Sequence, residues 1–370
     1  MKILSLGFDK FRNLETASIT PCENINIIYG DNAQGKTNII EAIWLLTGNK
    51  SFRGAKESEF IKFNEDFAKI NAGFYSQGRN QSAEIIYSKG KKEVFLNGVK
   101  KSGSSGLLGQ MCSVVFSPEH LSLIKSGPIE RRKFIDNALC QIKPSYRNTL
   151  LQYNKILANR NALLKDIPKN RKLIDTLDAW DYRLAVVGSV IIVMRRKYVN
   201  KLCEVASFYH SGISHKKEVL SIKYASTVPD VETRESDQIK DTILAMLNEH
   251  RNEEIAMSST SIGPHRDDID ITINGENVRA FGSQGQQRSC VLSMKIAEEE
   301  IIRISTDEEP IVLLDDVLSE LDCERQEFLL NEIEGKQVFI TCCDPDSVKR
   351  LKNGSLFKIQ DGSAECTQLS

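Results

Sequence analysis

The chain has 370 residues, of which 41% are hydrophobic and 27% are charged, and its formal net charge at pH 7 is −1. This charge excludes a uniformly basic protein, and the length allows a sizeable core arranged in two lobes. The nine cysteines include no C-x-x-C pair, so the sequence indicates neither a zinc site nor a disulfide framework.

The N-terminal residues and the apolar runs indicate the compartment. Residues 1–8 lack the long apolar region and cleavage site of a signal peptide, and they predict a first β-strand instead. The longest apolar stretch, about residues 184–194, is too short to span a bilayer. We therefore expect a cytoplasmic protein that does not enter the membrane and whose cysteines are reduced.

A phosphate-binding loop is predicted at residues 30–37, which fit the pattern G-x-x-x-x-G-K-[ST]. An apolar, β-branched run at 25–29 predicts a buried strand before the loop, and a helix is expected from about residue 38. In such loops backbone N–H groups surround the phosphates, Lys36 reaches the β and γ phosphates, and the hydroxyl of Thr37 ligates Mg²⁺. We therefore expect a bound nucleoside triphosphate. The expected contacts are Gly30, Asp31, Asn32, Ala33, Gln34, Gly35, Lys36, Thr37 and Asn38.

Alternating apolar and polar residues predict an antiparallel β portion. The alternation occurs at 83–87, 93–96 and 269–273, and the turn Asn274-Gly275 follows the last run. These runs add an antiparallel part to an otherwise α/β chain.

A helical hairpin is predicted between residues 146 and 198, where apolar side chains recur at steps of three and four, with Asn161 as a polar insertion. The segment 166–170 contains Pro168 and predicts the turn between two antiparallel helices. We expect the stripe to form core packing, and its few heptads exclude a long coiled coil. The stripe consists of Tyr146, Leu150, Tyr153, Leu157, Leu164, Leu173, Leu177, Trp180, Leu184, Val187, Ile191, Met194 and Tyr198.

A second anion-binding helix start is predicted at residues 281–288, which precede a largely buried helix at 289–304. Ser283 occupies the N-cap position and Gly285 permits close backbone approach, so Ser283, Gly285 and Gln286 are expected to grip a γ-phosphate. An ordinary capped helix is the alternative.

An acidic strand end follows. Residues 310–314 form an apolar run that predicts a buried parallel strand, and Asp315 and Asp316 then fall at the edge of the sheet where ligands bind. We expect Asp315 to hold Mg²⁺ and Asp316 to polarise the attacking water. Without the phosphate loop, a turn would be the more common explanation of two such acids.

The order of these three motifs resembles that of the ABC ATPases. The resemblance implies catalytic roles for Lys36, Asp315, Asp316 and Ser283, and an ATP-dependent homodimer in which the serine of one head caps ATP held by the other. It also identifies residues 319–322 as similar to the D-loop at the dimer interface.

The chain departs from the ABC pattern at two places, and the shorter side chain of Asp316 predicts slow turnover. Asp316 stands where many of these proteins have a glutamate, and Thr341-Cys342-Cys343 follows a strand where many have a switch histidine. No segment matches the usual Gln loop.

Motifs from the whole chain resemble the RecF family of bacterial SMC-like ABC ATPases, which lack a long coil. The matching segments are Phe11-Arg12-Asn13, Ser51-Phe52-Arg53, Phe116-Ser117-Pro118-Glu119, Leu123-Ile124-Lys125 with Gly127-Pro128, Arg131-Arg132-Lys133-Phe134-Ile135-Asp136 and Gly263-Pro264-His265-Arg266-Asp267-Asp268. The resemblance implies ATP-dependent dimerisation on DNA and slow hydrolysis in recombinational repair at single-strand gaps and stalled forks. It further implies single- or double-stranded DNA, gapped or branched at a junction, as a partner. It also implies that the chain cooperates with RecR and RecO in loading RecA.

Local basic clusters are the candidates for DNA contact, because the net charge excludes a uniformly basic surface. For each cluster a merely solvated surface is the alternative. Three roles remain open for His265, Arg266 and Arg53: a contact in the nucleotide pocket, a contact at the dimer interface, or a local salt bridge. The clusters are Arg131-Arg132-Lys133, Arg195-Arg196-Lys197, Lys216-Lys217, Lys91-Lys92 and Lys100-Lys101.

The expected fold is α/β, an ABC-type ATPase head with an antiparallel β portion and an inserted helical lobe that carries the short hairpin. Residues 1–125 are expected to form the N-terminal half of the head, 126–255 the helical lobe and 256–370 the C-terminal half. Two other functions remain open: the nucleotide-binding subunit of an ABC transporter, which should carry a Gln loop and switch histidine, and a structural SMC-like chromosome protein, which should carry a longer coil.

Overall fold

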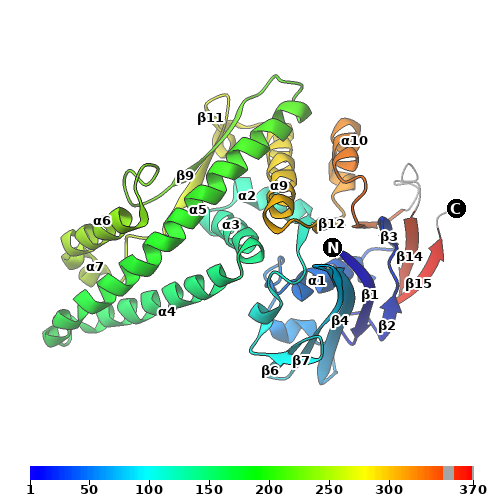
Figure 1. Cartoon of the computed structure of the whole chain (residues 1–370), viewed down its shortest axis with the longest axis horizontal. Helices are drawn as coiled ribbons and strands as arrows, with labels where there is room; N and C mark the ends of the chain where they lie inside the picture. The colour runs from blue at the N-terminus through cyan, green and yellow to red at the C-terminus, as the bar shows by residue number, and fades with distance from the viewer. Residues whose placement is uncertain (345–353, 369–370) are drawn as a thin grey trace. The chain divides into compact units, whose positions relative to one another are not determined.

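The computed structural model describes residues 1–344 and 354–368 (Figure 1). The chain divides into two compact units. Unit 1 consists of Met1–Ser122, Phe208–Lys217 and Gln284–Ser370, and unit 2 of Leu123–Ser207 and Glu218–Ser283. The helical lobe predicted at 126–255 falls mostly in unit 2, which also includes residues 256–283.

The first sheet of unit 1 carries the phosphate loop. Its strand order is β15-β14-β3-β13-β12-β8, and all neighbours pair in parallel except β14 and β15. Every residue of β12 and β13 is buried, which explains their unbroken apolar runs. The strands are β3 (Ile25–Tyr29), β8 (Ser113–Phe116), β12 (Ile311–Asp315), β13 (Val338–Cys342), β14 (Gly354–Gln360) and β15 (Ser363–Gln368).

The second sheet of unit 1 is antiparallel, in the order β2-β1-β4-β5-β6-β7. Its β5 and β6 contain the alternating runs predicted at 83–87 and 93–96. The strands are β1 (Lys2–Asp9), β2 (Ala17–Ile19), β4 (Phe67–Ser76), β5 (Arg79–Ser88), β6 (Lys91–Leu96) and β7 (Val99–Lys101).

Helix α1 (Lys36–Leu46) contacts strands of both sheets, so its apolar side chains are buried all round. Ile39, Ile43 and Trp44 belong to one core cluster with residues of the two sheets. This burial fixes the helix whose first turn follows the phosphate loop.

The other helices of unit 1 include α9 (Gln284–Thr306), which contains the helix predicted at 289–304, and α10 (Cys323–Glu332). In the part of the chain described, no helix is long and apolar enough to cross a membrane. No disulfide joins any of the nine cysteines, all of which lie in described segments. The 3-10 helices of this unit are η1 (Glu57–Phe60), η2 (Ser104–Leu107), η3 (Pro118–Leu121) and η5 (Leu318–Glu320).

Unit 2 is mainly helical and carries a three-stranded antiparallel sheet in the order β11-β10-β9. The predicted turn Asn274-Gly275 joins β10 to β11. The strands are β9 (Leu220–Ala225), β10 (Asp268–Ile273) and β11 (Glu276–Asn277). The helices are α2 (Ser122–Lys125), α3 (Pro128–Ile142), α4 (Ser145–Asp166), η4 (Arg171–Thr176), α5 (Leu177–Ile213), α6 (Ser236–Glu249), α7 (Arg251–Met257) and α8 (Val278–Phe281). The first residue of α2 and residues 208–213 of α5 belong to unit 1.

The predicted helical hairpin is formed by α4 and α5, and Leu164, Ile167 and Leu177 pack together at its turn. The helices also enclose an ionic network that the apolar stripe did not indicate. Arg160 is fully buried, and its guanidinium pairs with Asp181 at 2.6 Å and Glu254 at 2.7 Å. The interior of the hairpin region is therefore partly polar.

Candidate nucleotide site

The phosphate loop depends on two glycines with positive φ. Gly30 has φ +149°, and a Cβ there would overlap the carbonyl oxygen of Ile359. Gly35 has φ +112°, and a Cβ there would lie 2.6 Å from Oδ1 of Asn13. Any larger residue would therefore be strained and would push neighbouring groups out of place. Because α1 begins at Lys36, the loop ends at a helix N-terminus, which favours an anion.

Lys36 is held at the loop by neutral groups. Its Nζ donates to the carbonyl oxygens of Gly30 at 2.6 Å and Asp31 at 3.0 Å, and it lies 3.6 Å from Sγ of Cys343. Cys343 in turn contacts Oδ1 of Asn32 at 3.1 Å. No carboxylate neutralises the ammonium in these contacts, so its charge is available to a phosphate.

The hydroxyls of Thr37 in α1 and Thr341 in β13 meet the carboxylate of Asp315 at the end of β12. Both Thr37 and Thr341 donate their hydroxyls to Oδ1 of Asp315, each at 2.9 Å. The parallel register explains the meeting, because Thr341 lies opposite Asp315 on one side and Ile28 on the other. Burial raises the pKa of Asp315, while the hydrogen bonds from the two threonines lower it.

Asp316 has an unusual backbone for a residue other than glycine, with φ 54°. Its N–H donates to the hydroxyl of Thr341 at 2.9 Å, which holds this left-handed turn in place. Asp316 is exposed and lines the cavity beside the phosphate loop. Strained residues of this kind concentrate at functional sites.

The cavity beside the loop has an empty volume of about 660 Å³, including space open to solvent, which is within the usual range for ligand pockets. Most of its lining was expected from the sequence, whereas Gly285 and Gln286 of the signature segment do not line it. Gln34 accepts a hydrogen bond from the N–H of Asp361 at 2.8 Å. The lining residues are Asn32, Ala33, Gly35, Lys36, Thr37, Asn38, Arg53, Asp316 and Thr341.

The chain offers a site that fits Mg²⁺. Thr37 and Asp315 place two hard oxygen donors within hydrogen-bonding distance of each other, at the carboxyl edge of the sheet. Within residues 1–344 and 354–368, no group of three His, Cys, Asp or Glu residues could hold a metal ion. Mg²⁺ does not require such a group, since it usually takes one or two protein ligands together with phosphate oxygens and water.

A second network beside the loop was not predicted. Asn13 donates from Nδ2 to the carbonyl of Ala33 at 2.7 Å, and its Oδ1 accepts from Asn38 at 2.7 Å. The neighbouring Arg12 forms a two-pronged ion pair with buried Glu41, at 2.7 and 3.1 Å. The segment after β1 therefore braces both the loop and α1. Asparagine and arginine after a strand carry no local signal for this role.

The signature segment begins α9. Ser283 is exposed and directly precedes the helix, and Gly285 and Gln286 lie in its first turn. Arg325 of α10 donates to the carbonyl of Gly285 at 3.4 Å and to the hydroxyl of Ser289 at 2.8 Å. The start of α9 is thus tied to the helix that follows the D-loop segment.

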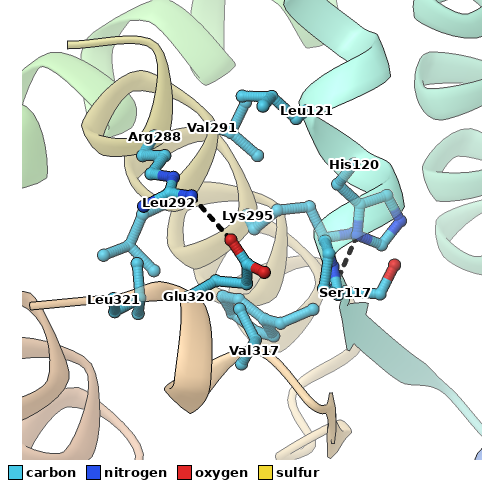
Figure 2. Close-up of a pocket in the computed structure, with 12 residues that line it drawn as sticks. Ser117, His120, Leu121, Arg288, Val291, Leu292, Lys295, Val317, Glu320 and Leu321 are labelled. Atoms are coloured by element: carbon cyan, nitrogen blue, oxygen red, sulfur yellow. Dashed lines mark hydrogen bonds and ion pairs between the residues drawn. The ribbon is translucent and has the colours of Figure 1, made fainter. Parts of the chain in front are cut away.

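Figure 2 shows a separate cavity between α9 and the D-loop segment, with Arg288 directed toward Glu320. Their side chains form an ion pair at 2.6 Å. Apolar side chains, including Val291, Val317 and Leu321, line most of the cavity, whose empty volume is about 480 Å³ with space open to solvent included. The contacts connect two segments that resemble the dimer-forming parts of ABC ATPases.

The predicted basic clusters lie only partly on the surface. Arg131 and Arg195 are 6% and 3% exposed, and they form ion pairs with Asp268 and Asp136 respectively. Arg196 is 7% exposed and donates to backbone carbonyls of its own unit. These three were wrong as surface cations, because runs of basic residues do not reveal which side chains form buried ion pairs.

Comparison with known proteins identifies the family. The sequence profile described as RecF/RecN/SMC N terminal domain matches residues 2–366. The chain is 44% identical over 337 residues to the DNA replication and repair protein RecF of Acetivibrio thermocellus, which covers 91% of each protein. The chain belongs to the RecF family. It is also 41% identical to RecF of Ruminiclostridium cellulolyticum, over 98% of this chain and 99% of that protein.

Solved structures support the same family assignment. The recombination mediator protein RecF in the RecFOR pathway, solved with ATP and with ATPrS, matches with a TM-score of 0.92 at 38% identity, covering 100% of this chain and 98% of RecF. An Smc head bound to the C-winged helix domain of ScpA matches with a TM-score of 0.58 at 16% identity, which shows the shared fold. The predicted ABC-type ATPase head with a helical lobe is therefore confirmed, and the chain is a RecF-family member of this ATPase class.

Proposed function

We propose that this RecF-family chain is a weak ATPase that dimerises with ATP and binds DNA in recombinational repair. The observation that carries the proposal is the meeting of Lys36, Thr37, Asp315 and Asp316 at one edge of the sheet, beside a cavity of nucleotide size. The solved RecF structures with ATP support the choice of nucleotide. The pathway name RecFOR supports cooperation with RecR and RecO. Help in loading RecA is part of the proposal.

The residues divide the work between binding and hydrolysis. Lys36 and the loop N–H groups bind the phosphates, and Thr37 and Asp315 hold Mg²⁺, which would neutralise charge on the phosphate oxygens. Asp316 orients and polarises the attacking water from a turn fixed by Thr341. An aspartate reaches less far than a glutamate, so slow turnover is expected.

Dimerisation completes the site. Gly285 and Gln286 do not line the cavity of their own chain, so in this proposal Ser283 and its neighbours act on ATP held by a second copy. ATP would then join two heads, and the joined heads would bind gapped or junction DNA. Hydrolysis would release the dimer.

Two variants test the division of roles. Lys36→Ala should weaken ATP binding in calorimetry and abolish hydrolysis, because the phosphate charge loses its main cation. Asp316→Asn should bind ATP normally and form a dimer that persists in sedimentation, because only water activation is lost. Unchanged ATP affinity in a folded Lys36→Ala protein, or rapid hydrolysis by Asp316→Asn, would contradict the proposal.

A further inference from the structure

The segment Gly263-Pro264-His265-Arg266-Asp267-Asp268 joins α7 to β10 within unit 2, and the nucleotide site does not account for it. Asp267 is 1% exposed, and its carboxylate anchors the segment. It accepts hydrogen bonds from the hydroxyls of Tyr224 and Ser226 and from the N–H and hydroxyl of Thr227. Arg195 donates to the carbonyl of Pro264 at 2.5 Å. The loop is thus fixed from several sides.

His265 is fixed in a single neutral state. The hydroxyl of Tyr153 lies 2.8 Å from Nδ1, and Nε2 lies 3.1 Å from the carbonyl oxygen of Thr260. Since a carbonyl only accepts, Nε2 carries the hydrogen and Nδ1 accepts from the tyrosine. Burial is the main cause that lowers the pKa of His265 to about 4; the charges of Arg266 and Arg132 act in the same direction, and the hydrogen bond to Thr260 opposes them. At neutral pH the local positive charge belongs to the two arginines.

Arg132 and Arg266 are held by carbonyl groups alone. Arg132, on α3, donates from Nη1 to the carbonyl of Asp267 at 2.6 Å. Arg266 donates from Nε and Nη2 to the carbonyl of Thr260, both at 3.2 Å. In the described segments neither guanidinium pairs with a carboxylate, in contrast to Arg131, whose fork is occupied by Asp268.

A guanidinium held by carbonyls is positioned without a direct ion pair, although the charges of Asp268, Asp267 and Asp136 act on Arg132 from nearby. Arg266 is exposed and Arg132 is half-buried, and most of their N–H groups remain available. Arg132 contacts the carbonyl of Asp267, the residue next to Arg266, and the charges of both arginines act on His265. An anion bound by both would be attracted by two positive charges. Planar guanidinium groups match phosphate oxygens and can bind them through two parallel hydrogen bonds.

We propose that Arg132 and Arg266 form a phosphate-binding pair through which unit 2 contacts the DNA backbone, and this inference rests on the proposed DNA-binding function. The pair contacts the sugar-phosphate backbone and not the base edges, so it contributes affinity without sequence preference. Three lysines of the candidate clusters, in contrast, form direct ion pairs with carboxylates. Lys133 pairs with Glu130, and Lys91 and Lys100 share Glu93.

The test is the salt dependence of duplex binding. Fluorescence anisotropy of a short labelled duplex, with ATP and Mg²⁺ over a series of KCl concentrations, should compare wild type with Arg132→Gln/Arg266→Gln. Loss of two phosphate contacts should weaken binding roughly tenfold or more at moderate salt and reduce the slope of log affinity against log salt by about 2 per chain. The charge-retaining Arg132→Lys/Arg266→Lys should keep most of the slope.

A matched control removes two charges elsewhere in the same unit. Lys201 and Lys240 pair with neighbouring carboxylates, and Lys201→Gln/Lys240→Gln should retain the wild-type slope. Arg266→Gln alone changes an exposed side chain and should reduce the slope by about 1, which gives a second reading if the double variant unfolds.

The outcomes distinguish failure of the arginine pair from failure of the proposed DNA-binding function. If wild type binds DNA with ATP and both glutamine variants keep its slope, the arginine pair is refuted and the DNA-binding function stands. If wild type shows no binding to duplex or gapped DNA with ATP, the proposed function fails and the pair with it.

Discussion

Thr341 provides the sharpest test of how the acidic strand end is built. Its side chain is 2% exposed, and its hydroxyl both donates to Asp315 and accepts from the N–H of Asp316, each at 2.9 Å. Thr341→Val preserves the shape of the side chain and removes both hydrogen bonds. The Asp315 carboxylate would keep the hydroxyl of Thr37, whereas the N–H of Asp316 would lose its partner.

The expected cost follows from these two losses. A hydrogen bond to a charged group contributes about 1.5–3 kcal/mol, and an unpaired buried N–H costs about 1–3 kcal/mol. Because Asp316 is exposed at the cavity, water can replace part of the second loss, so we expect destabilisation of about 2–3 kcal/mol. The backbone turn that positions Asp316 would also loosen. The kcat of the Thr341→Val protein for ATP hydrolysis should therefore fall by about tenfold to a hundredfold.

Urea unfolding without nucleotide measures the stability change, and steady-state hydrolysis measures kcat and KM separately. Thr341→Ser is the matched control, because it keeps the hydroxyl and loses only a methyl group. The valine variant should differ from the serine variant in both measurements. If valine and serine variants unfold at the same urea concentration and hydrolyse ATP equally fast, Thr341 does not hold the site.

Two further predictions concern the same edge of the sheet. Asp315→Asn should abolish hydrolysis and yet raise the unfolding temperature of the nucleotide-free protein near neutral pH, because burial raises the pKa of Asp315 and the fold holds its carboxylate at a cost. The gain in unfolding temperature should shrink as the pH falls toward the folded-state pKa of Asp315, because the wild-type carboxylate then becomes protonated and neutral as well. A lower unfolding temperature of Asp315→Asn at neutral pH would contradict this prediction. A thiol reagent should block ATP binding by modifying exposed Cys343, which lies 3.6 Å from Nζ of Lys36, and bound ATP should slow that modification in peptide mass spectrometry. Cys343→Ser should resist the reagent, and equal inhibition of that variant would show that another thiol is responsible.

The nucleotide-binding core was predictable because its signals are local. The run at 25–29 became β3, and the glycines of the loop occupy backbone conformations that larger residues avoid. The apolar run before Asp315 became a strand buried along its whole length. In each case a short stretch of sequence determines both the element and its chemistry.

The contacts between distant segments were not predictable. Thr341 meets Asp315 because β13 lies between β3 and β12, and a single sequence does not reveal strand order. The apolar stripe gave no sign that Arg160 is buried in ion pairs with Asp181 and Glu254. Arg131, Arg195 and Arg196 were wrong as surface cations for the same reason. Pairing partners that are far apart in the sequence decide whether a charge is structural or available.

In the proposed mechanism, ATP joins two heads and thereby strengthens DNA binding. DNA affinity against salt concentration, for wild type and Ser283→Arg with ATP and with ADP, tests it most directly. The bulky cation should block approach of the α9 N-terminus to a second copy, so only wild type with ATP should show tighter binding and a steeper salt dependence, since a dimer doubles the phosphate contacts. Identical slopes under all four conditions would contradict the account.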